Sequence, residues 1–180
     1  MKKISTKKLT FTALFAALIF VSSAFLQIPI PTPMGITRFH LGNTFCLIAG
    51  FLLGPGLGGL ASGLGSVIFD LTNPLYFSSA PITFITKFMM GYVAGLVLGK
   101  KRETINSYKL VKAGALGQIT YIVLYLGKTF IQNYFLMKLS LSATMVEIIQ
   151  KGGVSLTNGI ISVIIATILT LALKERVKVD

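Results

Sequence analysis

Few residues in this sequence could carry catalysis or hold a metal ion. There is one cysteine, Cys46, and one histidine, His40, and only 5 of the 180 residues are acidic. A single cysteine excludes an intramolecular disulfide and a cysteine metal cluster, and a lone histidine without acidic residues at ligand spacing predicts no metal site. Neither a nucleophile elbow nor paired carboxylates occur, so the sequence disfavours an enzyme and predicts no cofactor.

Charged residues of both signs are also scarce, and apolar residues take their place. Hydrophobic residues make up 53% of the chain and charged residues 12%, and the mean hydropathy is +0.79. A soluble domain of this size could not bury that much apolar surface. Six crossings of about 20 residues each would use roughly two thirds of the chain. The composition therefore predicts an all-α integral membrane protein with one domain over residues 1–180, surrounded by the lipid bilayer.

The hydrophobic runs predict the positions of six transmembrane helices. They cover residues 9–26, 41–53, 57–71, 82–98, 111–136 and 154–173. The first run is too long for the core of a signal peptide. The second and third are short and are separated only by Gly54, Pro55 and Gly56, which predicts a tight hairpin. Prolines in 27–39 exclude a continuous helix, so we expect a semi-rigid loop that either covers a binding site or only connects two helices.

The net charge of +12 is interpreted through its distribution, because cytoplasmic loops of membrane proteins retain Lys and Arg. If the N-terminus is cytoplasmic, 12 of the 17 basic residues fall on the inner side: Lys2, Lys3, Lys7, Lys8, Lys100, Lys101, Arg102, Lys109, Lys112, Lys174, Arg176 and Lys178. Both termini are therefore predicted to be cytoplasmic. The basic excess indicates membrane topology and not nucleic-acid binding.

Polar side chains within the predicted helices gather near the outer ends. An ionisable side chain in a spanning segment is costly unless it is paired or hydrated, so it marks a candidate site. The candidate substrate-binding residues are Arg38, His40, Asn43, Asp70, Tyr76, Thr83, Lys87, Tyr121, Tyr125, Lys128, Gln132 and Asn158. The inner halves of the same helices hold almost nothing polar. This asymmetry predicts a substrate cup open to the outside with an apolar floor, and not a continuous pore.

Four of these residues share one face of the fifth predicted helix. Their positions step by four, three and four: Tyr121, Tyr125, Lys128 and Gln132. Tyrosines there could stack on a flat heterocycle, and the alternative is an aromatic belt at the membrane interface. Asp70, near the end of the third predicted helix, needs a cation, which could be an internal lysine or arginine or an amine of the ligand.

Small residues four positions apart allow helices to approach closely in lipid. Glycines with this spacing occur in 50–58 and 91–99, and we expect them to pack the protein's own helices. Ala13 and Ala17 lie on a helix with otherwise large apolar residues. They could form a flat strip that docks a partner protein.

No nucleotide-binding loop is present. Gly127-Lys128-Thr129 spells the end of such a loop, but Ile122 stands where the motif has its first glycine. The competing interpretations are a small self-sufficient carrier or channel and a ligand-free membrane partner. A carrier would need ion-coupling groups or a polar path in the inner half.

Several segments resemble the S components of energy-coupling factor (ECF) transporters for vitamins. They are Thr37-Arg38-Phe39-His40-Leu41-Gly42-Asn43, Ala49-Gly50-Phe51-Leu52-Leu53-Gly54-Pro55, Gly63-Leu64-Gly65-Ser66 with Asp70, and Ala80-Pro81-Ile82-Thr83-Phe84-Ile85-Thr86-Lys87. The pair Ala13 and Ala17 is similar to the family's signature for docking onto its transmembrane coupling subunit. The pattern is most similar to members assigned to hydroxymethylpyrimidine and vitamin B6, with riboflavin and pantothenate members as near relatives.

This resemblance implies a six-helix bundle in a prokaryotic cell membrane that serves as the high-affinity binding subunit of an ABC importer. Its partners would be a transmembrane coupling subunit and two cytoplasmic ATPases, which supply the energy. Its ligand would be a water-soluble vitamin or precursor. Pyridoxine, pyridoxamine or hydroxymethylpyrimidine is expected first, with riboflavin or pantothenate as alternatives.

Overall fold

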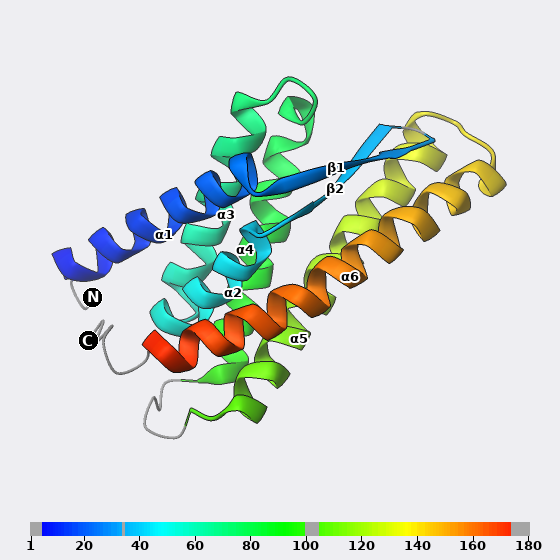
Figure 1. Ribbon diagram of the computed structural model, residues 1–180. Coiled ribbons are helices and arrows are strands. Elements are labelled where there is room, and N and C mark those ends of the chain that lie inside the picture. Colours follow the sequence, from blue (N-terminus) through cyan, green and yellow to red (C-terminus); the bar gives the residue numbers. More distant parts are fainter. Residues whose placement is uncertain (1–4, 34, 100–104, 174–180) are drawn as a thin grey trace.

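The computed structural model describes residues 5–33, 35–99 and 105–173. Its architecture is a bundle of six α-helices with a β-hairpin inserted after the first helix (Figure 1). The helices are α1 (Thr6–Phe25), α2 (Gly42–Leu53), α3 (Pro55–Thr72), α4 (Ala80–Leu98), α5 (Ser107–Phe130) and α6 (Leu141–Leu173). The strands are β1 (Gln27–Thr32) and β2 (Gly35–His40). A short 3-10 helix, η1 (Phe77–Ser79), precedes α4, and a π-helical segment, η3 (Ile131–Leu136), follows α5.

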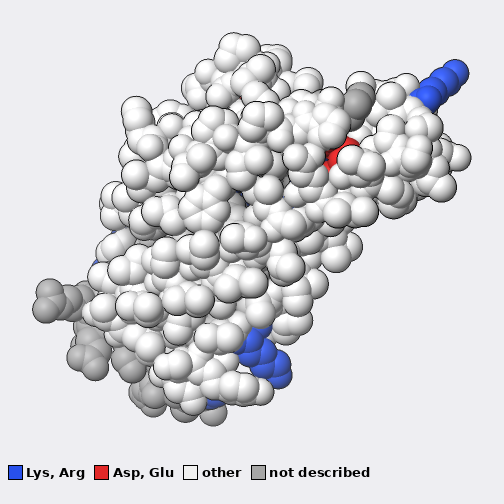
Figure 2. Space-filling model, turned by 45° about the vertical axis from the view of Figure 1, so that its right-hand side comes forward, with Lys and Arg blue, Asp and Glu red and all other residues white. Residues whose placement is uncertain are grey.

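The lengths and composition of these helices are those of a membrane protein, and the predicted count of six is confirmed. Within the described part of the chain, four segments are long and apolar enough to cross a bilayer: Thr6–Phe25, Phe77–Leu98, Ser107–Leu136 and Leu141–Leu173. α2 is a shorter apolar helix. Uncharged residues cover most of the face drawn in Figure 2. Such a surface suits contact with lipid.

The predicted hairpin between the second and third helices is present as α2 and α3. Gly54, at φ +80°, ends α2, and α3 starts at the next residue, Pro55. Proline suits the first turn of a helix because its missing N–H would have no partner there. A Cβ atom at Gly58 of α3 would lie 2.6 Å from Cα of Gly50 in α2, and one at Gly91 of α4 would lie 2.8 Å from the carbonyl oxygen of Gly58. These glycines pack the protein's own helices, as predicted.

The segment between α1 and α2 is an antiparallel hairpin, where the sequence predicted a semi-rigid loop. β1 pairs with β2 from Gln27 opposite His40 to Thr32 opposite Gly35. Pro29 and Pro31 occupy alternate positions of β1, so their missing N–H groups point to the same side of the strand. An edge strand tolerates prolines on its unpaired side. The prolines exclude a helix but are compatible with this strand.

The bundle has two ends of different construction (Figure 1). The end that contains the turn around Gly54, here called the α2–α3 end, also contains the start of α1 and the end of α6. The opposite end, here called the hairpin end, contains the β1–β2 hairpin, the α3–α4 connection and the start of α6. Among the basic residues predicted on the inner side, four lie in the first two turns of α1 and α5: Lys7, Lys8, Lys109 and Lys112. The others lie outside the described residues: Lys2, Lys3, Lys100, Lys101, Arg102, Lys174, Arg176 and Lys178.

α6 begins at Leu141, well before the predicted start at residue 154. The prediction failed because polar residues and two glycines in 147–153 interrupt the apolar run. Glu147 and Lys151 lie one helical turn apart and form an ion pair, with 2.8 Å between the nitrogen and the carboxylate oxygen. Pairing lowers the cost of placing either charge in a helix. At 33 residues, α6 is about 50 Å long, so it exceeds the hydrocarbon thickness of about 30 Å.

Candidate binding cavity

A cavity lies at the hairpin end, between β2 and the parts of α3, α4, α5 and α6 that meet there. Its volume of about 400 Å³ falls in the range of small-molecule sites. Eleven of the predicted site residues line it: Arg38, His40, Asp70, Tyr76, Thr83, Lys87, Tyr121, Tyr125, Lys128, Gln132 and Asn158. Residues far apart in the sequence thus meet in one cavity, and their contact with a ligand stays a prediction.

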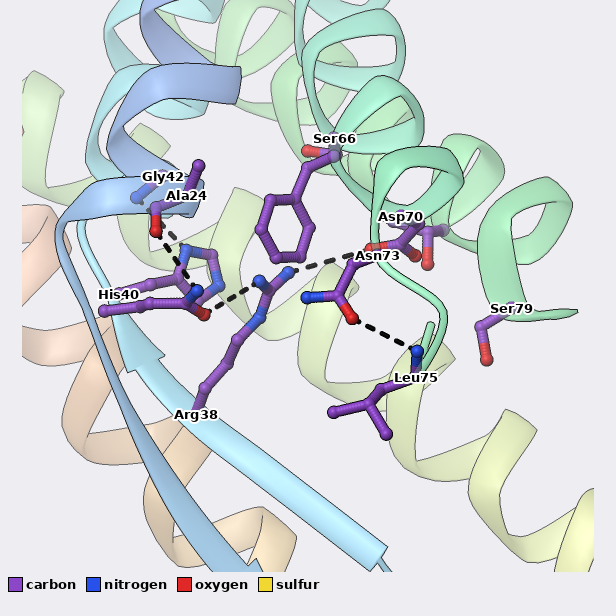
Figure 3. A network of polar contacts seen from close by, with 12 residues as sticks. Ala24, Arg38, His40, Gly42, Ser66, Asp70, Asn73, Leu75 and Ser79 are labelled. Atoms are coloured by element: carbon purple, nitrogen blue, oxygen red, sulfur yellow. Dashed lines mark hydrogen bonds and ion pairs between the residues drawn. The ribbon is translucent and has the colours of Figure 1, made fainter. Parts of the chain in front are cut away.

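Arg38 reaches from β2 toward the end of α3 (Figure 3). Its Nη1 donates a hydrogen bond to Gln27 Oε1 at 3.1 Å, and its Nη2 lies 3.7 Å from Asp70 Oδ1. The guanidinium carbon lies 3.7 Å from the ring centroid of Phe69 and 4.7 Å from that of Tyr76. Asp70 therefore has an internal cation, and the two rings add cation–π contacts to the guanidinium.

Lys87 reaches the cavity from α4 and is 4% exposed. Its Nζ donates a hydrogen bond to Asn43 Oδ1 and lies 3.7 Å from the ring centroid of Tyr121. Asn43 itself does not belong to the cavity wall. Asn43 therefore contributes to the predicted site only indirectly, because its side chain in α2 accepts the hydrogen bond that positions Lys87.

The predicted stripe on α5 forms one wall. The rings of Tyr121 and Tyr125 are stacked, with 5.7 Å between centroids and 13° between planes. One turn further, Lys128 Nζ donates a hydrogen bond to Ser79 Oγ of η1 at 2.9 Å. Gln132 continues the wall into η3. Two parallel rings between Lys87 and Lys128 present a surface on which a planar ligand could stack.

His40 lies two residues after Arg38 on β2, so the two side chains share one face of the strand. It is buried, and its Nδ1 accepts a hydrogen bond from the backbone N–H of Gly42 at 3.1 Å (Figure 3). Burial, and then the charges of Lys87 and Arg38, hold the pKa of His40 well below its ordinary value. The described residues contain no group of three or more side chains placed to hold a metal ion. His40 is therefore a neutral hydrogen-bonding residue.

The part of the wall that comes from the start of α6 was missed from the sequence. Lys151 lines the cavity, and its partner Glu147 is fully buried. Thr32 Oγ1 donates a hydrogen bond to Glu147 Oε1 at 2.8 Å, and Gln150 Nε2 donates to the Pro31 carbonyl oxygen at 3.2 Å. These bonds attach β1 to α6 beside the cavity. The spacing of Glu147 and Lys151, four residues apart, is the sequence signal that could have found this helix turn.

Buried polar side chains continue beyond the cavity, in the part of the bundle where the sequence predicted an apolar floor. One turn before Tyr121, Gln118 of α5 is 3% exposed, and a Cβ at Gly159 of α6 would lie 2.6 Å from its Cγ. Further along α6, Ser162 and Thr170 are fully buried. The polar face of α6 therefore continues toward the α2–α3 end, and close helix packing closes the cavity there.

The candidate docking residues Ala13 and Ala17 are both exposed on α1. Leu14 and Leu18 beside them are 50% and 37% exposed. Phe15, in contrast, faces the core at 6% exposed. Ala13 and Ala17 therefore lie on an apolar outer face of the helix.

Residues 3–175 match the family model described as ECF-type riboflavin transporter, S component. A protein of Pyrococcus woesei, described as an uncharacterized protein in the gap 3′ region, is 28% identical over 111 residues, which cover 62% of this chain and 70% of that protein. Among solved structures, the crystal structure of the S-component for biotin from an ECF-type ABC transporter has a TM-score of 0.59 and 21% sequence identity, covering 92% of this chain and 91% of that chain. This likeness shows a common fold.

Proposed function

The chain belongs to the family of ECF-type riboflavin transporter S components, and on this premise we propose that it binds a water-soluble vitamin or precursor in the cavity at the hairpin end. The observation that carries the proposal is the stacked pair Tyr121 and Tyr125 within a cavity of about 400 Å³. Aromatic surface with a few convergent polar groups is the usual construction of a small-molecule site. As a transport subunit, the protein binds its ligand without changing it chemically.

The stacked rings favour a ligand with a flat ring. Pyridoxine, pyridoxamine and hydroxymethylpyrimidine are the first candidates, because a pyridine or pyrimidine ring suits a tyrosine surface. Riboflavin is the second candidate, because it is the vitamin in the description of the matching family. Pantothenate has no ring and would depend on the basic side chains of the cavity.

In the proposed orientation the cavity opens to the outside of a prokaryotic cell membrane, and both termini are cytoplasmic. Lys7 and Lys8 in α1 and Lys109 and Lys112 in α5 support this assignment, because they lie at the starts of helices at the α2–α3 end. The partners would be a transmembrane coupling subunit and two cytoplasmic ATPases. The exposed strip around Ala13 and Ala17 would contact the coupling subunit.

The experiment that tests the binding function is thermal unfolding of the purified protein against the five candidate compounds, because a ligand of the native state raises Tm. We expect one compound to raise Tm clearly. Tyr125→Ala should weaken its binding about tenfold through loss of ring stacking. Tyr108→Ala is the control, since Tyr108 is 74% exposed at the start of α5. If no compound shifts Tm, or Tyr125→Ala and Asn158→Ala both bind normally, the proposed function or its site is wrong.

Docking is tested separately by Ala13→Leu and Ala17→Leu, which add bulk to the exposed strip. Ligand binding by the purified protein should be unchanged, while vitamin uptake by cells that contain the complete transporter should be lost. Leu14→Ile is a control that keeps the size and apolar character of a neighbouring position. Normal uptake by the doubly substituted protein would remove this strip from the proposed interface.

A further inference from the structure

The cavity wall has an excess of positive charge. Its basic side chains are Arg38, Lys87, Lys128 and Lys151, and its one acidic side chain is Asp70. Two ion pairs join these groups within the described chain: Arg38 with Asp70 at 3.7 Å, and Lys151 with Glu147 at 2.8 Å. Lys87 and Lys128 have no carboxylate partner within 4 Å among the described residues. Two cations of the cavity therefore have no ion pair of their own, and they share with Arg38 the more distant charge of Asp70.

The surroundings of Lys87 make this imbalance costly. Its ammonium group is almost fully buried, and its contacts are the amide oxygen of Asn43 and the ring of Tyr121. Both partners are uncharged. A buried ammonium group without a carboxylate loses hydration that neutral partners only partly replace. Lys87 is therefore poised to gain from a negative charge in the cavity.

Lys128 occupies the other end of the tyrosine pair. It follows Tyr125 by three residues on the same helix face, and its contact is the hydroxyl of Ser79. Lys87 lies against Tyr121, the other member of the pair. The two unpaired ammonium groups thus face one cavity from α4 and α5, with the stacked rings between them.

We infer that the transported substrate carries an anionic group, a carboxylate or a phosphate, which binds Lys87 or Lys128 while the rest of the molecule contacts Tyr121 and Tyr125. This inference rests on the proposed function and narrows its substrate class: of the five candidate compounds only pantothenate carries such a group, and the others would qualify only as carboxylated or phosphorylated derivatives. An anion in the cavity completes the charge balance that the protein leaves open. It would also form charge-assisted hydrogen bonds, which are stronger than those between neutral groups.

Matched pairs of compounds test the inference whichever vitamin the protein binds. The pairs are 4-pyridoxate and pyridoxine, nicotinate and nicotinamide, pantothenate and pantothenol, and riboflavin 5′-phosphate and riboflavin. In at least one pair, the acidic member should raise Tm and bind roughly thirtyfold or more tightly than its neutral partner. If a neutral member binds as well as its acid or better, the receptor function stands and the inference is overturned. If no compound of any pair binds, the inference is overturned, and the proposed function itself fails if none of the five candidate compounds binds either.

Single substitutions of the two lysines test where in the cavity the anionic group binds. Lys87→Gln removes the charge and keeps a hydrogen-bond donor, one bond shorter, on the side of Asn43, and Lys128→Gln removes the charge at the other end of the rings. At least one of them should abolish the preference for the acidic compound, while the Tm of unliganded Lys87→Gln stays equal or rises. Lys109→Gln, at an exposed lysine in the first turn of α5, should keep the preference. An unchanged preference in both cavity variants overturns the inference, and Lys87→Met, which also removes the charge, replaces Lys87→Gln if that variant does not fold.

Two further probes test whether the anion that binds the cavity belongs to a vitamin, to free phosphate or to a lipid headgroup. Inorganic phosphate and the anionic lipid phosphatidylglycerol are titrated into the detergent-solubilised protein in place of the vitamins. A weak effect of either, displaced by the acidic compound of the matched pair, agrees with the inference. A shift of Tm with the lipid or phosphate that no acidic vitamin reproduces or displaces would overturn it.

Discussion

The two ends of this helix bundle differ in how tightly their helices pack. The α2–α3 end is closed and is called the closed end below, whereas the hairpin end surrounds the cavity and is called the open end. At the α2–α3 end, Gly50, Gly58 and Gly91 bring three helices into backbone contact. At the hairpin end the helices diverge around a cavity of about 400 Å³ whose wall carries charged side chains. At these three glycines the first end leaves no room for an added methyl group, whereas the second end leaves room for a small molecule. The contrast suggests that the closed end fixes the helix directions from which the open end is built.

The contacts at the open end join side chains, whereas those at the closed end join the backbones of the glycines. The side chains of the open end are held across elements, as Arg38 of β2 is by Asp70 of α3 and Lys87 of α4 is by Asn43 of α2. Such contacts can be exchanged for contacts with a ligand, whereas the backbone contacts of the glycines cannot. Substitutions at the two ends should therefore differ in whether they affect folding or binding.

The largest effect is expected from Gly58→Ala at the closed end. The added Cβ would lie 2.6 Å from Cα of Gly50, and backbone atoms cannot yield as a flexible side chain can. We expect a loss of about 2–3 kcal/mol in the free energy of unfolding, measured as a lower Tm in detergent. Gly56→Ala is the matched control on the same helix, because no atom lies within 4 Å of its added Cβ. Equal Tm values for the two variants would show that close packing at this end is not critical.

Much of the closed end was predictable from local sequence. Gly54 followed by Pro55 sets both the end of α2 and the start of α3, since each residue constrains the backbone by its own chemistry. The spacing of Gly50, Gly54 and Gly58 predicted close packing for the same reason. The turn at Gly54 and Pro55 is set by neighbouring residues, whereas the glycine spacing predicts close packing without identifying the helix that packs there, which includes α4 through Gly91.

A middle-sized effect is expected from Glu147→Gln at the open end. This change removes the charge that pairs with Lys151 and keeps an oxygen for Thr32. Because Lys151 retains 16% exposure of its side chain, hydration limits the loss to about 1–2 kcal/mol. Hydrogen–deuterium exchange should become faster in β1 and the start of α6.

Gln150→Ala serves as the comparison for this variant. It removes one exposed hydrogen bond to the Pro31 carbonyl, so its Tm should stay near that of the wild type. If the amides of β1 exchange at the same rate in Glu147→Gln as in the wild type, the ion pair does not hold the hairpin to α6.

The open end was predictable in its residues and less so in its architecture. The helix period placed Tyr121, Tyr125 and Lys128 on one face, and the cavity contains all three. The hairpin depends on pairing between β1 and β2 and on its attachment to α6, and neither is visible in a hydropathy pattern. Glu147 was missed because a charge that interrupts an apolar run resembles a helix end until its partner is identified. The buried Gln118 was missed for a similar reason, since close packing at Gly159 accommodates it.

The smallest effect is expected from His40→Asn, as a change in pH dependence. Burial and the charges of Lys87 and Arg38 hold the pKa of His40 well below its ordinary value, so the folded protein keeps this imidazole neutral. The unfolded chain takes up the proton near the ordinary pKa of about 6.5, so stability is complete above that pH and falls as the pH decreases below it. Asparagine can still accept the hydrogen bond from Gly42 but does not titrate. Between pH 7 and pH 6 the variant should therefore lose about 0.7 kcal/mol less stability than the wild type, because the remaining acidic groups titrate in both proteins. Parallel plots of Tm against pH would mean that His40 is protonated in the folded state as readily as in the unfolded chain, and that the open end tolerates a further positive charge.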